Sequence, residues 1–187
     1  MKIILASKSP RRKELLSKIC PEFEIRVSDI DETLDGTYTP EESVELLAVM
    51  KGAAVSASAL ENELVISSDT LVELDGAALG KPKDEEDARR MLRALSGRAH
   101  NVHTGVCVHY KGKIYSGVKT SRVYFRELTK EEISDYVLSG EPMDKAGAYG
   151  IQGAAGKFVH RLEGDMDTVV GLSLELTEKL IKRALAE

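Results

Sequence analysis

Residues 1–16, MKIILASKSPRRKELL, decide the class of fold. Residues 1–6 are apolar and partly β-branched, which predicts a buried strand. Ser9 suits the N-cap of a helix and Pro10 its first position, and Leu15 and Leu16 then fall on the inner face of that helix. A strand followed at once by a helix begins a mixed α/β order.

The rest of the chain continues this alternation. Further strands are expected at residues 23–27, 64–67, 71–74, 102–110, 113–124 and 158–162, and helices at 40–60, from 84, from 129 and at 172–185. The helix from 84 is expected to have Ala88, Met91, Leu92 and Leu95 on its inner face. A glycine-rich loop is expected at residues 147–156. The length of 187 residues suits one domain, so we expect residues 1–187 to form a single α/β domain in which helices flank a mixed, twisted sheet.

The composition is that of an ordinary globular protein, with 42% hydrophobic and 30% charged residues. The N-terminal apolar run is too short for a signal peptide, and no apolar stretch approaches the ~20 residues that span a bilayer, which predicts a cytoplasmic protein without a membrane partner. Cys20 and Cys107 lack the spacing of metal or redox motifs and are expected to be reduced, buried thiols. The net charge of −5 disfavours a stable nucleic-acid partner, so any anionic ligand must meet local positive charge.

The first turn of the expected N-terminal helix carries Arg11 and Arg12, where free N–H groups and the helix dipole already make the surroundings positive. An anion held by the hydroxyls of Ser7 and Ser9, by backbone N–H groups and by the two guanidinium groups would remove this conflict. Phosphate is the best geometric match. A solvated basic helix start is the alternative, and the motif alone leaves both open.

Two lysines fall at informative positions. Lys51 lies on the stripe of its expected helix that should face the core, so it needs either a buried partner or a route along which its ammonium reaches water. Lys81 lies in a loop between a glycine and a proline, where a second phosphate ligand and a plain surface turn fit equally.

Two carboxylates are candidates for a metal site. Asp69 follows the apolar run 64–66, which places it at the end of an expected strand, a common position for sites in α/β proteins. Glu32 lies in an acidic loop and could add a second oxygen ligand for Mg²⁺. A turn-capping aspartate and an exposed loop glutamate are the alternatives.

Zinc and covalent catalysis have no support in the sequence. His100 and His103 are three apart in an expected strand and therefore point to opposite faces. Ser67 and Ser68 lack a G-x-S-x-G context, and neither cysteine lies in a recognisable nucleophile motif. Attack by a metal-activated water is the economical alternative.

The motifs, taken in order, resemble the Maf family of nucleotide pyrophosphatases along essentially the whole chain. The matching stretches are SKSPRRKELL at 7–16, Glu32, Lys51, Ser68-Asp69-Thr70, Gly80-Lys81-Pro82 and Leu95-Ser96-Gly97. Residues 144–153, DKAGAYGIQG, are similar to the branch that acts on dTTP and UTP rather than the branch that favours 7-methyl-GTP. Residues 164–168 and Ser173 depart from the family pattern, and we expect these departures to alter at most a rim or a dimer contact.

The resemblance implies roles for the catalytic residues. Asp69 is the expected acid/base residue and Glu32 its partner at the metal site, while Lys51 and Lys81 hold phosphates. The expected cofactor is Mg²⁺ or Mn²⁺, bound by Glu32, Asp69 and the substrate phosphates. The fold that the family implies resembles inosine triphosphatase and has a cleft between two lobes.

The resemblance also implies which residues select the base. Arg12, Thr70 and Gln152 match the specificity positions of the dTTP/UTP branch. The Gln152 amide can donate to O4 and accept from N3–H of thymine or uracil, a pattern that cytosine inverts. Because an amide can flip to follow the inversion, neighbouring fixed groups must lock its orientation.

The expected function is hydrolysis of dTTP and UTP to the monophosphate and pyrophosphate, which limits incorporation of non-canonical nucleotides. One alternative is a pyrophosphatase for modified or other nucleotides, with the same phosphate machinery and a different base pocket. The other is a nucleotide-binding regulator of cell division. A homodimer is expected from the resemblance alone.

Overall fold

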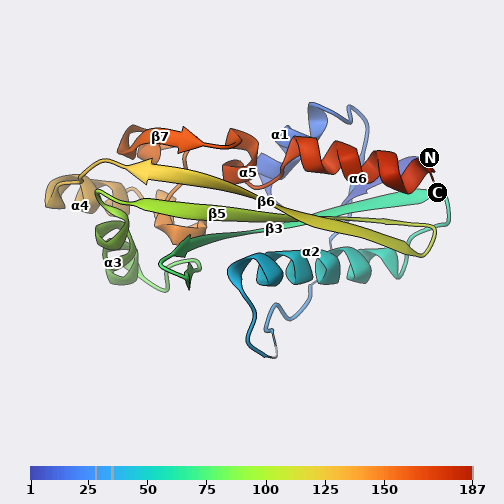
Figure 1. Ribbon diagram of the computed structural model, residues 1–187, viewed down its shortest axis with the longest axis horizontal. Coiled ribbons are helices and arrows are strands. Elements are labelled where there is room, and N and C mark those ends of the chain that lie inside the picture. Colours follow the sequence, from blue (N-terminus) through green and yellow to red (C-terminus); the bar gives the residue numbers. More distant parts are fainter. Residues whose placement is uncertain (28, 35, 187) are drawn as a thin grey trace. The chain divides into compact units, whose positions relative to one another are not determined.

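The computed structural model of the protein describes residues 1–27, 29–34 and 36–186. Strands and helices alternate along the chain as the sequence predicts (Figure 1). The strands are β1 (Lys2–Leu5), β2 (Glu24–Ile25), β3 (Glu63–Leu74), β4 (Ala77–Leu79), β5 (Ala99–Tyr110), β6 (Lys113–Phe125) and β7 (Val159–Glu163). The α-helices are α1 (Pro10–Ser17), α2 (Pro40–Ser56), α3 (Glu85–Leu95), α4 (Lys130–Leu138), α5 (Met166–Val170) and α6 (Leu174–Ala186), and the 3-10 helices are η1 (Glu141–Asp144), η2 (Ala146–Ala148) and η3 (Ala154–Phe158).

The strands form one mixed sheet in the order β2-β1-β3-β5-β6-β7, and β4 pairs with β3. β1 pairs in parallel with both β2 and β3, with Leu5 opposite Ile66, whereas the β3–β4 and β6–β7 pairs are antiparallel. The predicted α/β class, a mixed twisted sheet flanked by helices, is confirmed. The predicted cleft between two lobes stays a prediction.

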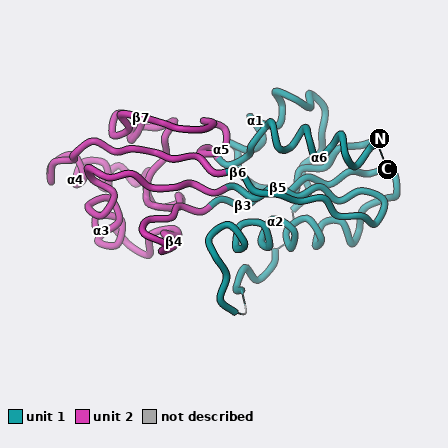
Figure 2. The backbone as a smooth tube through the Cα atoms, in the orientation of Figure 1, with its two compact units in different colours: residues 1–70, 104–119, 171–187 teal, residues 71–103, 120–170 magenta. Residues whose placement is uncertain are grey.

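The chain divides into two compact units (Figure 2). Unit 1 comprises residues 1–70, 104–119 and 171–187, and unit 2 comprises residues 71–103 and 120–170. Three of the four boundaries fall inside β3, β5 and β6, and the fourth follows directly after α5, between Val170 and Gly171. Whether residues 1–187 behave as one domain stays a prediction.

Unit 1 contains helices on both faces of its strands, α2 on one and α1 and α6 on the other (Figure 1). α2 lies close against β5, because a Cβ added to Gly105 would come within 2.3 Å of the Val44 carbonyl oxygen. α2 also meets β3, where Ser67 Oγ donates to the Ala48 carbonyl oxygen at 2.6 Å. These two contacts fix the helix that carries Lys51.

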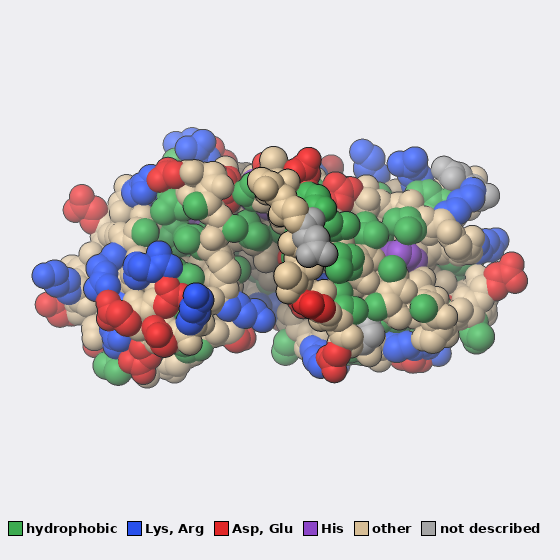
Figure 3. Space-filling model, turned by 90° about the horizontal axis from the view of Figure 1, so that it is seen from below, with side chains coloured by type: hydrophobic (Ala, Val, Ile, Leu, Met, Phe, Trp, Pro, Cys, Tyr) green, Lys and Arg blue, Asp and Glu red, His purple; other side chains and the backbone are tan. Residues whose placement is uncertain are grey.

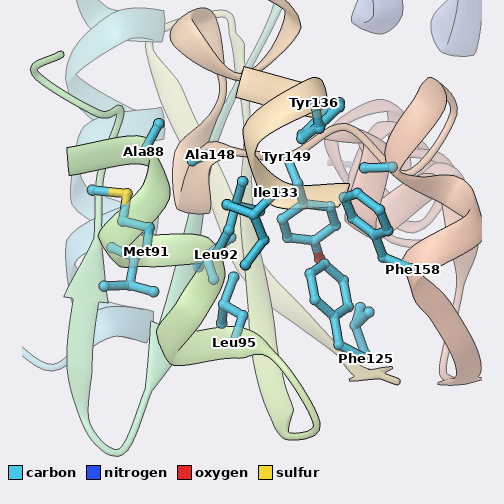
Figure 4. Close-up of a cluster of buried hydrophobic side chains, with 14 of the residues drawn as sticks. Ala88, Met91, Leu92, Leu95, Phe125, Ile133, Tyr136, Ala148, Tyr149 and Phe158 are labelled. Carbon is cyan, nitrogen blue, oxygen red and sulfur yellow. The ribbon is translucent and has the colours of Figure 1, made fainter. Parts of the chain in front are cut away.

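Unit 2 has a core of aliphatic and aromatic side chains (Figure 4). The predicted inner face of α3 is confirmed, since all four of its expected members are buried: Ala88, Met91, Leu92 and Leu95. They pack in one cluster with Phe125, Tyr149 and Phe158. The Phe125 and Tyr149 ring centroids lie 4.8 Å apart in an edge-on arrangement, which aromatic rings prefer.

Several boundaries differ from the sequence-based expectation. α2 ends at Ser56, before the expected residue 60, and β2 covers only Glu24–Ile25 of the expected 23–27. β4 and α5 were not expected, and the glycine-rich loop contains parts of η2 and η3. Short elements of this kind are stabilised by contacts with distant residues, which local propensity does not contain.

The surface and the cysteines agree with the composition. On the face drawn in Figure 3, acidic and basic side chains are interspersed. Cys20 and Cys107 are free and buried, as expected. None of the helices in the described part of the chain combines the length and apolar character that crossing a bilayer requires.

Candidate active site

Arg12 is the centre of a hydrogen-bonded group in unit 1. Its Nε donates to the Gly171 carbonyl oxygen at 2.8 Å, Nη2 to Thr70 Oγ1 at 3.3 Å and Nη1 to Ser7 Oγ at 3.5 Å. Burial is the main influence and lowers the pKa of Arg12, while the charge of Asp69 acts in the opposite direction. A guanidinium stays protonated in proteins, and these three partners are neutral, so they orient the positive charge without cancelling it.

Ser7 and Ser9 shape the segment before this arginine. Ser9 Oγ accepts from the Arg12 N–H at 3.4 Å and caps α1, as predicted, and Pro10 occupies the first turn. The Ser9 N–H donates to Ser7 Oγ at 3.2 Å. Both hydroxyls therefore build the helix start, and Arg11 follows them in its first turn, half-buried.

Lys51, Asp69 and Glu32 form a charged cluster in unit 1, which we call the lysine–carboxylate cluster. Lys51 Nζ lies 2.6 Å from Asp69 Oδ1 and 2.9 Å from Glu32 Oε2. The side chains of Lys51 and Asp69 are 17% and 13% exposed, and that of Glu32 is 55% exposed. Of the two alternatives for Lys51, the structure shows the one in which its ammonium group has carboxylate partners. Lys51 lies on the face of α2 that the sequence indicates.

Asp69 lies inside β3 rather than at its end, which corrects the expectation from sequence. The polar residues at its flanks are held by partners far away in the chain. Ser68 Oγ donates to the Gly171 carbonyl oxygen at 2.8 Å, and the Thr70 and Thr104 hydroxyls lie 2.9 Å apart. These bonds keep polar residues in strand geometry on both sides of the carboxylate.

The donor set of the cluster fits a divalent cation only in part. Glu32 and Asp69 converge on one ammonium group, so they present oxygen ligands to a single point. Within residues 1–27, 29–34 and 36–186 no group of three or more histidine, cysteine or acidic side chains could hold a metal ion. Mg²⁺ is commonly bound by one or two carboxylates together with substrate phosphates, so phosphate and water oxygens would have to complete the coordination.

Lys81 and Gln152 belong to unit 2. Both are exposed. The Gly147 N–H donates to the Gly80 carbonyl oxygen at 3.1 Å, which ties the loop of Lys81 to the glycine-rich segment. The structure therefore brings together Ser7, Ser9, Arg11, Arg12, Lys51, Asp69, Thr70 and Glu32 in unit 1, and places Lys81 and Gln152 in unit 2.

The histidines do not form a metal site. His103 is fully buried, with Nδ1 2.8 Å from Thr120 Oγ1 and Nε2 3.1 Å from Glu73 Oε2. His100 Nε2 lies 2.8 Å from the Tyr149 hydroxyl, and burial lowers the pKa of His100 to about 4. The two rings therefore have separate hydrogen-bond partners.

Two residues of the site, Gly171 and Thr104, were not identified from the sequence. The Gly171 carbonyl accepts from both Arg12 and Ser68, and the Thr104 hydroxyl contacts Thr70. Thr104 lies in a strand with several other polar residues, so its residue type alone does not single it out.

The fold and the site together define an α/β protein in which an oriented arginine belongs to the same unit as a lysine–carboxylate cluster. The chain belongs to the Maf-like protein family, whose model matches residues 2–184. The resemblance inferred from the motifs is confirmed.

Several relatives of similar length share the same description. A protein of Geobacillus sp. (strain WCH70), described as dTTP/UTP pyrophosphatase, is 50% identical over 181 residues, which cover 97% of each chain. Proteins with the same description from Thermococcus gammatolerans and Vibrio cholerae are 48% and 46% identical; the matches cover 95% and 97% of this chain and 94% and 97% of those proteins.

Solved structures of low sequence identity also match this chain. A nucleoside-triphosphatase, dITP/XTP pyrophosphatase, from Mycobacterium abscessus has a TM-score of 0.47 and 13% identity, covering 100% of this chain and 95% of that one. The Ham1 protein of Staphylococcus aureus has a TM-score of 0.48 and 18% identity, covering 86% of this chain and 92% of that one.

Proposed function

We propose that this protein hydrolyses dTTP and UTP to the nucleoside monophosphate and pyrophosphate. The observation that carries the proposal is the lysine–carboxylate cluster, in which Lys51 Nζ bridges Asp69 and Glu32 at 2.6 and 2.9 Å. Relatives at 46 to 50% identity that are described as dTTP/UTP pyrophosphatases support the substrate.

Asp69 is the proposed general base. One hydrogen bond from Lys51 occupies its Oδ1, and its second carboxylate oxygen can take the proton of an attacking water. The oxygen of that water forms a bond to the α-phosphorus, the bond from the α-phosphorus to the oxygen that bridges to the β-phosphate breaks, and pyrophosphate leaves with that oxygen. A carboxylate is a weak base for a water molecule, so the water needs further activation.

A divalent cation is the proposed source of that activation. Mg²⁺ or Mn²⁺ held by Glu32, Asp69 and phosphate oxygens would lower the pKa of a bound water. Lys51 contacts both carboxylates, so it balances their charge and can turn its ammonium group toward a phosphate.

In this proposal the basic side chains neutralise the negative charge of the substrate phosphates. The partners of Arg12, which are Gly171, Thr70 and Ser7, are neutral. They orient its guanidinium group and leave the positive charge uncompensated. Arg11, Lys51 and Lys81 add to this effect, and electrostatic stabilisation is usually the largest contribution in phosphoryl transfer. Gln152 is the proposed group that recognises the base.

The test is pyrophosphate release from a panel of canonical and modified nucleoside triphosphates with Mg²⁺ or Mn²⁺, using wild type, Asp69→Asn and Asp75→Asn. Asp75 is the matched control, an exposed carboxylate paired with Arg98 at 2.7 Å in unit 2. The proposal expects fast release from dTTP and UTP in wild type and Asp75→Asn, and none in Asp69→Asn.

The remaining outcomes separate the alternatives. Release from other bases with Asp69 dependence would keep the mechanism and replace the substrate by modified or other nucleotides. No release from any nucleotide, with binding retained, would favour the regulator of cell division. The homodimer, the cytoplasmic location and the lack of a nucleic-acid partner stay predictions.

A further inference from the structure

Gln152 lies at the tip of a tight turn in unit 2. The Gly153 N–H donates to the Gly150 carbonyl oxygen at 3.0 Å, which makes Ile151 and Gln152 the two central residues of the turn. Gln152 is exposed, and within the described ranges no protein group hydrogen-bonds its amide. The backbone of the turn therefore sets the position from which the Gln152 side chain extends.

Both ends of this turn are tied to one carboxylate. The Ala154 N–H donates to Glu141 Oε2 at 3.2 Å, directly after the turn. The Gly150 N–H donates to the Tyr136 hydroxyl at 3.1 Å, and this hydroxyl donates in turn to Glu141 Oε1 at 3.1 Å. Glu141 thus fixes one end directly and the other through Tyr136.

Tyr136 is suited to act as the link because its position and its protonation are both fixed. Its ring is buried in the unit 2 core and lies edge-on to Phe158, with centroids 5.3 Å apart (Figure 4). Burial raises the pKa of Tyr136 well above its usual range, so the hydroxyl keeps its proton and continues to donate to Glu141.

The backbone of the turn lies directly on Glu141. A Cβ added to Gly153 would come within 2.0 Å of Glu141 Oε1, so a larger residue there would displace the Glu141 carboxylate. Lys145 Nζ donates to the Glu141 carbonyl oxygen at 2.6 Å and holds the backbone of η1, in which Glu141 lies. The backbone of the residue that carries the carboxylate is therefore held as well.

We propose that Glu141, acting with Tyr136, is a positioning residue for base selection that holds the turn so that Gln152 meets the base from one fixed backbone position. This inference rests on the proposed function. A fixed backbone position limits the distances and angles at which the Gln152 amide can meet the polar edge of thymine, uracil or cytosine. Neither side chain is assigned to the phosphate chemistry.

The test compares steady-state kinetics on dTTP and dCTP for wild type, Gln152→Ala, Tyr136→Phe, Glu141→Ala and Glu141→Gln. The measured quantity is the ratio of kcat/KM for dTTP to that for dCTP. Tyr136→Phe removes the link with little change in shape, and we expect it to lower the ratio about three- to tenfold, as loss of one or two hydrogen bonds implies. KM for dTTP should rise, while kcat stays within about twofold.

The two Glu141 variants should lower the dTTP/dCTP ratio to different degrees. Glu141→Ala should lower the ratio at least as much as Tyr136→Phe, and Glu141→Gln, which keeps one acceptor oxygen, should fall between Glu141→Ala and wild type. In Gln152→Ala, adding Tyr136→Phe should change the ratio no further, because the amide that the link positions is gone. Tyr124→Phe is the matched control, since the Tyr124 hydroxyl donates to Glu163 at 2.9 Å and to no atom of the turn.

The outcomes distinguish this inference from the proposed function. A ratio that falls in Gln152→Ala and stays at the wild-type value in Tyr136→Phe and both Glu141 variants would overturn the positioning role and leave the proposed function intact. A ratio that Gln152→Ala leaves unchanged would overturn the role of Gln152 in base recognition and this inference with it. If Glu141→Ala fails to fold, the ratios measured for Tyr136→Phe and Glu141→Gln test the positioning role. A fall in kcat with an unchanged ratio in these variants would mean a structural role only.

Discussion

Glu63 and Asp69 are two carboxylates on one strand, β3, with opposite surroundings. Glu63 is 3% exposed, and Arg26 donates to its two oxygens at 2.9 and 3.1 Å while the Leu60 N–H adds a third bond at 2.9 Å. Asp69 is 13% exposed, and among the described side chains only Lys51 donates to it, at 2.6 Å.

The difference shows how a carboxylate is kept available for chemistry. The hydrogen bonds to Glu63, chiefly that from Arg26, lower its pKa to about 2, so it remains an anion and has few acceptor sites left. Asp69 retains an oxygen without a donor among the described side chains, at a position that a ligand or a water can reach. We infer that Glu63 serves the stability of unit 1 and Asp69 serves the reaction.

Lys51→Met should give the largest effect after loss of Asp69 itself. Removing the ammonium leaves Asp69 and Glu32 without their shared cation, and it removes a positive charge from the phosphate site. We expect kcat for dTTP to fall by about 10²- to 10³-fold, the usual range for loss of one oriented charge-stabilising group. Lys119→Met is the control, because Lys119 forms an exposed pair with Glu175 at 2.6 Å in the same unit. A Lys51→Met enzyme as active as Lys119→Met would contradict the role of the cluster.

Arg12→Lys should have an intermediate effect. The lysine keeps the charge, but its ammonium group cannot reproduce the guanidinium fork, whose three nitrogens donate to Gly171, Thr70 and Ser7. We expect KM for dTTP to rise about tenfold with a smaller change in kcat, as measured by steady-state kinetics. Unchanged kinetics would mean that charge alone matters at this position and that the fork does not.

Glu63→Gln should have the smallest effect on activity and a visible effect on stability. Glu63 has a pKa of about 2 in the folded protein and an ordinary value of 4.5 when unfolded. Its folded pKa is depressed, so its contribution to stability is fully present above about pH 4.5 and is lost as the pH falls toward 2. The free energy of unfolding, measured by denaturant titration across this window, should fall less steeply for Glu63→Gln than for wild type. Parallel curves would contradict the assignment.

Local rules predict the parts of the fold that depend on neighbouring residues. Ser9 and Pro10 predict the start of α1, and the spacing of apolar residues predicts the buried face of α3, because capping and periodicity act within a few residues. The cluster residues Lys51 and Asp69 were also found, one as a cation on an apolar stripe and the other as an acid beside an apolar run.

The course of β3 could not be predicted in this way. The polar run at residues 68–70 suggests a break, yet the strand continues from Glu63 to Leu74. Ser67 and Ser68 remain buried because their hydroxyls bond the Ala48 and Gly171 carbonyls, which come from distant parts of the chain. The same reason hides the roles of Gly171 and Glu141, whose partners are set by tertiary structure.

The most direct test of the central claim is to measure, for Asp69→Asn and Glu63→Gln side by side, both kcat for dTTP hydrolysis and the thermal unfolding midpoint. The account predicts that Asp69→Asn loses turnover and keeps a midpoint near that of wild type, whereas Glu63→Gln keeps turnover below its own midpoint and unfolds at a lower temperature. Substantial turnover by folded Asp69→Asn would contradict the assignment of Asp69 as the general base.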